Sequence, residues 1–291
     1  GVYGGRDGDE VITLLDQLEV PSIVVLHTVL TDPTEHQREV LDSVVARADA
    51  VVTMSRTARD RLIAGYAVDA DKVRIIAHGA PEIAAVTVTP TFRTGQFTIL
   101  TWGLLGPGKG IEWGIEAMAE LQDLRPMPRY LVAGQTHPKV LLHEGEAYRD
   151  RLRARVRDLS LESSVSFDAH YRDADALAQL VRSADVVLLP YDSTDQVTSG
   201  VLIEAVAAGK PVVATQFPHA LELLAGGAGL VIPHRDPAAI AAALRTMITR
   251  RDLASEMASA AAAAAPQLLW PAVAEQYRQL AARLITACVA A

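Results

Sequence analysis

The stretch YDSTDQVTSGVLIEAVAAGKPVVAT, residues 191–215, decides the fold of this chain. The apolar run ADVVLLP ends just before it, and the stretch itself closes on a second apolar run, PVVAT. Between the two runs lie a short polar loop, a helical segment that begins near residues 198–200 and a Gly-Lys-Pro turn. A strand, a helix and a strand in this order predict a βαβ unit with a right-handed crossover.

The start of this helix is a candidate ligand site. Ligands of open α/β sheets bind at the carboxyl ends of the strands, where helix N-termini point at them. Backbone amides of Thr198, Ser199 and Gly200 would suit a phosphate, and Glu204, about one turn later, could accept hydrogen bonds from sugar hydroxyls. An ordinary capped helix without a ligand is the alternative, and this stretch alone leaves both open.

Composition excludes several classes of protein. The chain has 291 residues, of which 50% are hydrophobic and 21% charged, so it is long and apolar enough for about two folded domains. Its net charge of −8, without an obvious basic face, argues against nucleic acid as the main partner. A single cysteine, Cys288, excludes an internal disulfide framework and fits a reducing compartment.

The ends and the hydropathy of the chain give further expectations. No apolar run reaches the length of a membrane span. The opening GVYGGRDGDE has neither the basic nor the apolar part of a signal peptide, and it resembles the interior of a longer protein. We therefore expect a cytoplasmic location, with a position at the inner membrane face left open.

The first third of the chain alternates helix and strand. This order indicates a parallel sheet covered by helices, and Ser55 is a candidate N-cap for the helix that follows it. Only about three strands are visible, fewer than a doubly wound domain usually has, so we expect an incomplete domain. The predicted helices are 10–18, 34–48 and the segment after Ser55, and the predicted strands are 21–29, 49–53 and 72–80.

A second α/β set follows residues 81–96, which contain two prolines and no helical period and are predicted to be a linker. We expect three parts: a partial N-terminal domain with linker at 1–93, a second Rossmann-like domain at 94–265, and a closing helix at 266–291. Further predicted strands are 97–103, 129–134, 164–171 and 229–233, and further helices are 111–121, 147–159, 173–184, 236–248 and 251–264.

The loop GPGKG at 106–110 lies between a predicted strand and a predicted helix. Glycines such as Gly108 let the backbone approach a phosphate, and Lys109 would supply a positive charge. The spacing matches neither a Walker A loop nor a dinucleotide fingerprint, so the loop alone does not identify a site.

Histidines give weaker signals. His27 and His78 each end a predicted strand, and a structural role explains either equally well. The group His137, His143, Glu144 and Glu146 matches no known metal-ligand spacing, and such loops are usually only solvated. We therefore predict no metal.

Together these segments resemble the retaining glycosyltransferases of the GT-B fold, in the large class called family 4. The resemblance covers nearly the whole chain and is strongest over 97–234. Five stretches match in order and spacing. They are VVLHTV, IIAHGA, GLLGPGKG, QVTSGVLIEAVAAGKPVVAT and LLWPAVAEQY.

The resemblance assigns roles to individual residues. It implies that Lys109 pairs with the donor diphosphate, that Glu204 holds the ribose hydroxyls, and that His27 lies near the reacting carbon on the acceptor-side domain. It also implies that Gln196 and the backbone of residues 198–200 face the donor sugar and phosphates. The strand exit from Phe167 to His170 should flank the nucleobase.

Two positions depart from the family pattern. Leu104 stands where the family usually has a phosphate-binding arginine, and Gln196 replaces a glutamate. The first change removes a bidentate cation, and the second removes a charge while adding a hydrogen-bond donor. Both changes bear on which donor the chain uses and on whether it is active.

The implied function is metal-independent transfer of a sugar from a nucleotide-diphosphate sugar to a sugar, lipid or small-molecule acceptor, with retention at the anomeric carbon. A bacterial-like enzyme that needs no cofactor fits this reading, and peripheral membrane association and homo-oligomers are left open. One alternative is a non-catalytic nucleotide-sugar-binding subunit or part of a split enzyme. The other is a nucleotide-sugar epimerase of the same fold.

Overall fold

The computed structural model describes residues 4–82 and 95–290, and the chain divides into two compact units. The first unit comprises residues up to 79, the short segment 195–199 and residues from 270 onward. The second comprises 80–194 and 200–269. Most of the predicted linker at 81–96 lies outside the described residues.

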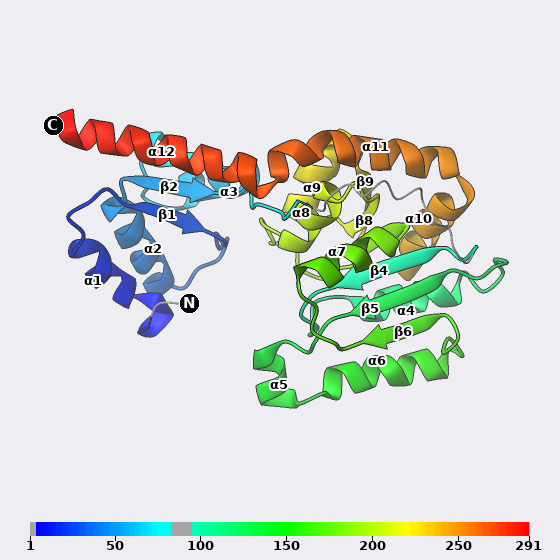
Figure 1. Cartoon of the computed structure of the whole chain (residues 1–291). Helices are drawn as coiled ribbons and strands as arrows, with labels where there is room; N and C mark the ends of the chain where they lie inside the picture. Colours follow the sequence, from blue (N-terminus) through cyan, green and yellow to red (C-terminus); the bar gives the residue numbers. More distant parts are fainter. Residues whose placement is uncertain (1–3, 83–94, 291) are drawn as a thin grey trace. The chain divides into compact units, whose positions relative to one another are not determined.

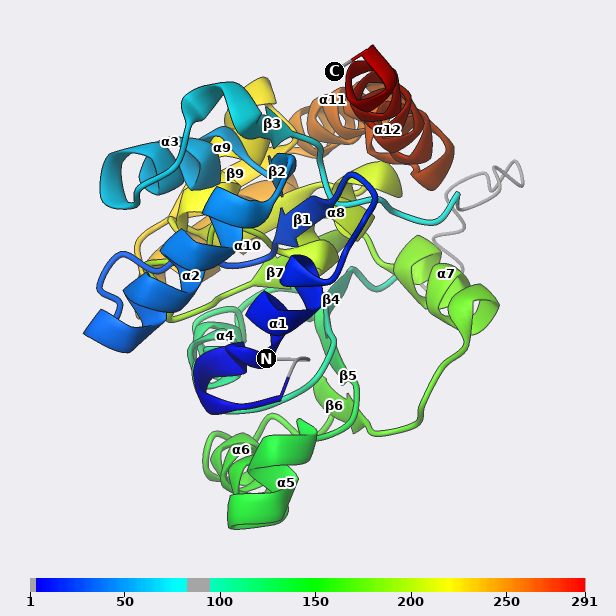
Figure 2. The same cartoon turned by 90° about the vertical axis from the view of Figure 1, so that its left-hand side faces the viewer.

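The first unit contains a parallel sheet between two layers of helices (Figure 1; Figure 2). Its strands run in the order β1-β2-β3, with Val24 opposite Val51 and Val51 opposite Val73. Three strands are described here, as predicted. The elements are η1 Arg6–Gly8, α1 Glu10–Asp16, β1 Ile23–Leu26, α2 Glu35–Arg47, β2 Ala50–Thr53, α3 Arg56–Gly65, η2 Ala70–Lys72, β3 Val73–Ile75 and α12 Trp270–Ala290.

Local signals explain why these helices begin where they do. Thr34 and Gln37 form a capping box at the start of α2, because each side chain binds the other's backbone amide. Ser55 caps α3 as predicted, since its Oγ accepts from the amide of Ala58 at 3.1 Å.

The two faces of this sheet bury different helices. On one face, Val51 and Val73 pack with Val45 of α2 and Leu62 of α3. Alternate side chains of a strand point to opposite faces, so the neighbours of Val51 face the other way. There Ala50, Val52 and Ile76 pack with Val273 and Leu280 of α12.

The second unit is built on a six-stranded parallel sheet in the order β6-β5-β4-β7-β8-β9. The predicted βαβ unit is present as β7-α8-β8, with Val187 opposite Val212. Its elements are β4 Thr98–Trp102, α4 Ile111–Ala119, β5 Arg129–Ala133, α5 Pro138–Glu144, α6 Ala147–Asp158, β6 Val165–Asp168, α7 Ala174–Ser183, β7 Val186–Leu189, α8 Gly200–Ala207, β8 Val212–Thr215, α9 Pro218–Leu223, η3 Leu224–Gly226, β9 Gly229–Ile232, α10 Pro237–Thr249 and α11 Arg251–Leu268.

The strand order places a switch point at the centre of this sheet. From β4 the chain adds β5 and β6 on one side, and then β7, β8 and β9 on the other. The loops after β4 and β7 therefore diverge, and ligands of doubly wound sheets bind in the crevice that such loops form. Helices α4, α6 and α10 cover one face of the sheet, and α8 packs along α11.

Two helices differ from the predictions. The polar loop after β5 contains α5, where Pro138 occupies the first turn and the Nδ1 of His137 accepts from the amide of Lys139 at 3.1 Å. Proline suits a first helical turn, so this start was readable from the sequence. Helix α11 continues through Pro266 to Leu268, beyond the predicted end at 264.

Candidate functional site

The Gly-rich loop 106–110 lies at the switch point and is held against the segment that follows β7. Gly110 has φ +63°, and a Cβ there would lie 1.8 Å from the carbonyl oxygen of Pro190. The carbonyl of Gly108 accepts from the amide of Asp192 at 3.0 Å. Glycine is therefore required for this close approach, which joins the two diverging loops.

Lys109 projects from this loop onto an aromatic ring. Its Nζ lies 4.5 Å from the centroid of the Tyr191 ring, whose other neighbour is Phe217 with a centroid distance of 5.4 Å. Burial lowers the pKa of Lys109, because the ammonium loses hydration. An anion bound beside Lys109 would replace that lost hydration.

A cavity of about 170 Å³ opens at the carboxyl ends of β4, β5 and β6. Its lining combines an indole, leucines and glycine backbone with an amide and an arginine, which suits a flat, partly polar ring. The lining residues are Trp102, Gly103, Leu104, Ala133, Gly134, Gln135, His170, Tyr171, Arg172, Leu177 and Leu180.

Glu204 lies beside this cavity. The Nε1 of Trp102, which lines the cavity, donates to the Oε2 of Glu204 at 3.4 Å. Helix α8 begins at Gly200, so Glu204 is one turn inside it, as predicted. A carboxylate beside a cavity that suits a flat ring could bind the hydroxyls of a ribose attached to that ring.

The exit of β6 is organised by Asp168. Its carboxylate accepts from the amide of His170 at 2.9 Å and from the Nδ1 of the same residue at 2.8 Å, and it also pairs with Arg172. The amide of His170, then its ring and Arg172, lower the pKa of Asp168 to about 2. His170 thus lines the cavity, whereas Phe167 packs against the core of the sheet.

The remaining predicted site residues belong to the first unit. His27 follows β1 directly, and its ring centroid lies 6.2 Å from that of His78. Burial, and then the charge of His78, lower the pKa of His27. The Nδ1 of His78 donates to the carbonyl of Gly79 at 2.8 Å. His27 is therefore disposed to be neutral near pH 7, when its ring can accept one hydrogen bond and donate another.

Gln196, Thr198 and Ser199 lie on the segment 195–199, which packs in the first unit. Ser55 donates to the carbonyl of Val197 at 2.8 Å, and the Val197 side chain is part of the core cluster of this unit. The side-chain amide of Gln196 donates to the carbonyl of Thr198 at 3.0 Å. The structure therefore places these residues in the first unit and Gly108, Lys109, Phe167, His170, Gly200 and Glu204 in the second.

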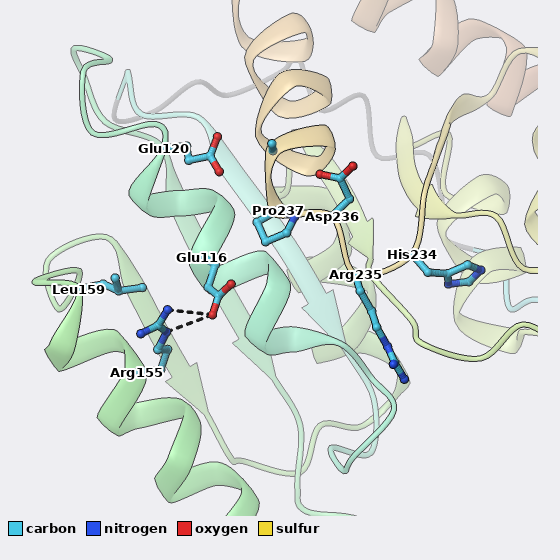
Figure 3. A pocket seen from close by; sticks show the side chains of 9 residues that line it. Glu116, Glu120, Arg155, Leu159, His234, Arg235, Asp236 and Pro237 are labelled. Carbon is cyan, nitrogen blue, oxygen red and sulfur yellow. Dashed lines mark hydrogen bonds and ion pairs between the residues drawn. The ribbon is translucent and has the colours of Figure 1, made fainter.

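A larger hollow of about 480 Å³ contains none of the predicted site residues. Figure 3 shows Arg155 of α6 reaching Glu116 of α4, while His234 and Arg235 lie on the loop between β9 and α10. The Arg155–Glu116 distance is 2.9 Å, and Arg235 pairs with Asp192 at 3.3 Å. Both arginines of this hollow are therefore ion-paired, and we assign no ligand to it.

The histidine loop is likewise engaged in local contacts. His137 caps α5, and Glu146 accepts from Thr136 and Arg149. Within residues 4–82 and 95–290, no group of three or more His, Cys, Asp or Glu side chains is placed to hold a metal ion.

Sequence reasoning missed Trp102, Gln135, Tyr171 and Arg172 as cavity residues. All four lie at or just after the ends of strands on one half of the sheet. The rule that ligands meet the carboxyl ends of parallel strands could have found them once the order of those strands was known.

Comparison with known proteins identifies the family. The model of the family "Glycosyl transferases group 1" matches residues 88–264. The D-inositol 3-phosphate glycosyltransferase of Kineococcus radiotolerans is 30% identical over 89% of this chain and 65% of its own length. That of Acidothermus cellulolyticus is 28% identical over 86% of this chain and 59% of its own length. The chain thus spans about three fifths of these curated relatives.

Solved structures agree in fold. Sucrose-phosphate synthase from Thermosynechococcus elongatus superimposes with a TM-score of 0.78 at 23% identity, covering 94% of this chain and 70% of its own. Anabaena HepE in complex with UDP gives 0.78 at 22% identity, covering 97% and 78%. The predicted GT-B-like α/β fold with parallel sheets is therefore confirmed. None of the helices in the described part of the chain is long and apolar enough to cross a membrane.

Proposed function

The chain belongs to the group 1 family of glycosyl transferases, and on that premise we propose that it transfers a sugar from a nucleotide-diphosphate sugar to an acceptor with retention of the anomeric configuration. Residues 94–265 are proposed to bind the donor. The acceptor-side part is proposed to be residues 1–93 together with the closing helix, which the structure begins at Trp270 and not at the predicted residue 266. The proposed reaction uses no metal and no cofactor.

One observation carries the donor site: the second unit collects a cation, a cavity and a carboxylate around the switch point of its sheet. Lys109 lies on the loop after β4, the cavity opens at the ends of β4 to β6, and Glu204 contacts the cavity through Trp102. A nucleoside diphosphate offers an anion, a ring and ribose hydroxyls. Diphosphate at Lys109, base in the cavity and ribose at Glu204 match these three groups.

The proposed chemistry relies on stabilising the departing diphosphate. Negative charge grows on the leaving phosphate as the glycosidic bond breaks, so a fixed cation such as Lys109 favours the transition state over the bound donor. The N-terminus of α8, which begins at Gly200, would add partial positive charge. Neutral His27 is proposed to contact the transferred sugar from the acceptor-side part.

The names of two related proteins suggest candidate donors. One relative is a GDP-mannose-dependent mannosyltransferase from Mycobacterium tuberculosis, 30% identical over 56% of this chain and 37% of its own length. HepE was solved with UDP.

Calorimetry with UDP, GDP and ADP therefore tests the proposal, and we expect at least one to bind. Sugar transfer assayed with the matching donor should persist in excess chelator. Binding of none of the three would overturn the donor site, and binding without transfer would favour a non-catalytic subunit.

Replacing Glu204 by glutamine is expected to act on donor binding more than on turnover. The glutamine amide can still accept one hydrogen bond from a ribose hydroxyl. It lacks the negative charge that strengthens the hydrogen bonds from both ribose hydroxyls to the carboxylate. We expect the apparent KM for the donor to rise roughly 10-fold with kcat little changed, as for loss of uniform binding. Glu120→Gln, in the larger hollow, is the matched control and should change neither. A fall confined to kcat would show that Glu204 acts in the chemical step.

A further inference from the structure

Arg149 of α6 is a charged side chain with 2% of its surface exposed. Its Nε donates to Glu146 at 3.1 Å, and its Nη2 donates to the carbonyl of Gly134 at 2.7 Å and to the Oγ1 of Thr136 at 3.4 Å. Its Nη1 has no hydrogen-bond partner among the described residues. A buried guanidinium with an unpaired nitrogen is costly, so its presence calls for a function.

The contacts of Arg149 converge on the segment 134–137, which leaves the carboxyl end of β5. This segment is joined to the loop after β4. The amide of Leu105 donates to the carbonyl of Gln135 at 2.8 Å, and the amide of His137 donates to the carbonyl of Leu105 at 2.7 Å. A Cβ on Gly134 would lie 1.9 Å from the carbonyl oxygen of Gly103. The two backbones are in contact, so a shift of one moves the other.

The Gly-rich loop continues directly from this junction. A Cβ on Gly106 would lie 3.0 Å from a methyl carbon of Val140 on α5, so the first half of the loop rests on the segment after β5. The second half is held by the Gly108–Asp192 hydrogen bond. Lys109 thus belongs to a loop that is held at Gly106 by the contact with Val140 and at Gly108 by the hydrogen bond to Asp192.

We propose that Arg149 is a positioning residue for diphosphate binding: its buried guanidinium fixes the segment 134–137 and thereby the backbone that carries Lys109. This inference rests on the proposed function, in which Lys109 binds the donor diphosphate. Glu146 is 47% exposed, and we assign the positioning effect to the hydrogen bonds that Arg149 donates to Gly134 and Thr136.

The variant Arg149→Met tests this proposal, and Arg155→Met is its control. Both arginines lie on α6 and both are ion-paired, but Arg155 reaches Glu116 at the larger hollow (Figure 3). For whichever of UDP, GDP or ADP binds, affinities are measured for the nucleoside diphosphate and for its nucleoside. Arg149→Met should weaken the diphosphate about 10-fold or more and the nucleoside clearly less, because the phosphate contact depends on Lys109, whereas only Gly134 and Gln135 of this segment line the cavity proposed for the base. Arg155→Met should change neither.

The proposal would be overturned if Arg149→Met weakened the affinities for the diphosphate and the nucleoside equally. It would also be overturned if neither affinity changed. Should that variant not fold, Thr136→Val removes one of the contacts and is expected to show the same selectivity with a smaller loss. Hydrogen exchange without ligand gives a second readout. The amide of Leu105 should exchange faster in the Arg149 or Thr136 variant and not in Arg155→Met, and unchanged exchange would count against the proposal.

The two readouts separate this inference from the proposed function. If the wild type binds none of the three nucleotides, the proposed donor site fails, and hydrogen exchange still decides whether Arg149 fixes the loop. If Lys109→Met loses diphosphate affinity and Arg149→Met does not, only the role of Arg149 is wrong.

Discussion

Lys109→Met is expected to weaken nucleoside diphosphate binding by roughly 10- to 100-fold, the range for losing a hydrogen bond to a charged group. The loss in kcat/KM for transfer should be larger, because the leaving diphosphate gains charge in the transition state. Lys210→Met is the matched control. Lys210 is also a partly buried lysine whose pKa is lowered by burial, but its Nζ donates to the carbonyls of Arg182 and Ala184. The variant Lys210→Met should lower the stability of the protein and leave its affinity for the diphosphate unchanged.

The pH dependence of the same interaction gives an independent check. The pKa of Lys109 is lowered from 10.5, so the free protein loses this charge at a lower pH than an exposed lysine would. Diphosphate affinity should therefore fall as pH rises through that pKa, and Lys109→Arg should keep its affinity there because arginine stays charged. An affinity that is unaffected by Lys109→Met, or a wild-type profile that is flat to high pH, would refute the role of Lys109.

Val273→Asp is expected to unfold the first unit. Val273 has no exposed surface and packs with Ala50, Val52, Ile76 and Leu280 between α12 and the sheet. An aspartate there would bury an unpaired carboxylate and leave a poorly filled space, at a cost of more than about 4 kcal/mol. Thermal unfolding followed by circular dichroism should show an early transition for the first unit.

Val289→Asp on the same helix is the control for this result, because Val289 is 84% exposed and should tolerate the change. Nucleoside diphosphate binding provides the second readout. The second unit has its own core and carries Lys109 and Glu204, so affinity should persist in Val273→Asp. Unchanged stability of Val273→Asp would show that α12 does not cover this face of the sheet in solution.

Much of the fold could be predicted from the sequence because its signals are local. Caps such as Ser55, apolar runs such as ADVVLLP and the glycines of 106–110 depend on neighbours within a few residues. The order of helices and strands, the βαβ unit at 186–215 and the family resemblance followed from them. The placement of Glu204 one turn into its helix followed in the same way.

The tertiary structure decided what depends on residues distant in the chain. The strand order alone brings Trp102, Gln135 and Arg172 to one cavity, because three separate strands end there. It also buries Arg149 against the segment 134–137, which is hydrogen-bonded to the loop after β4. In the sequence Arg149 is one of several arginines on a charged helix, and its neighbours show no sign of its burial. Sequence by itself therefore determined the elements and the residue types at their ends. The packing of the sheet decided which of those ends meet, because they are distant in the chain and come together only when the strands pair.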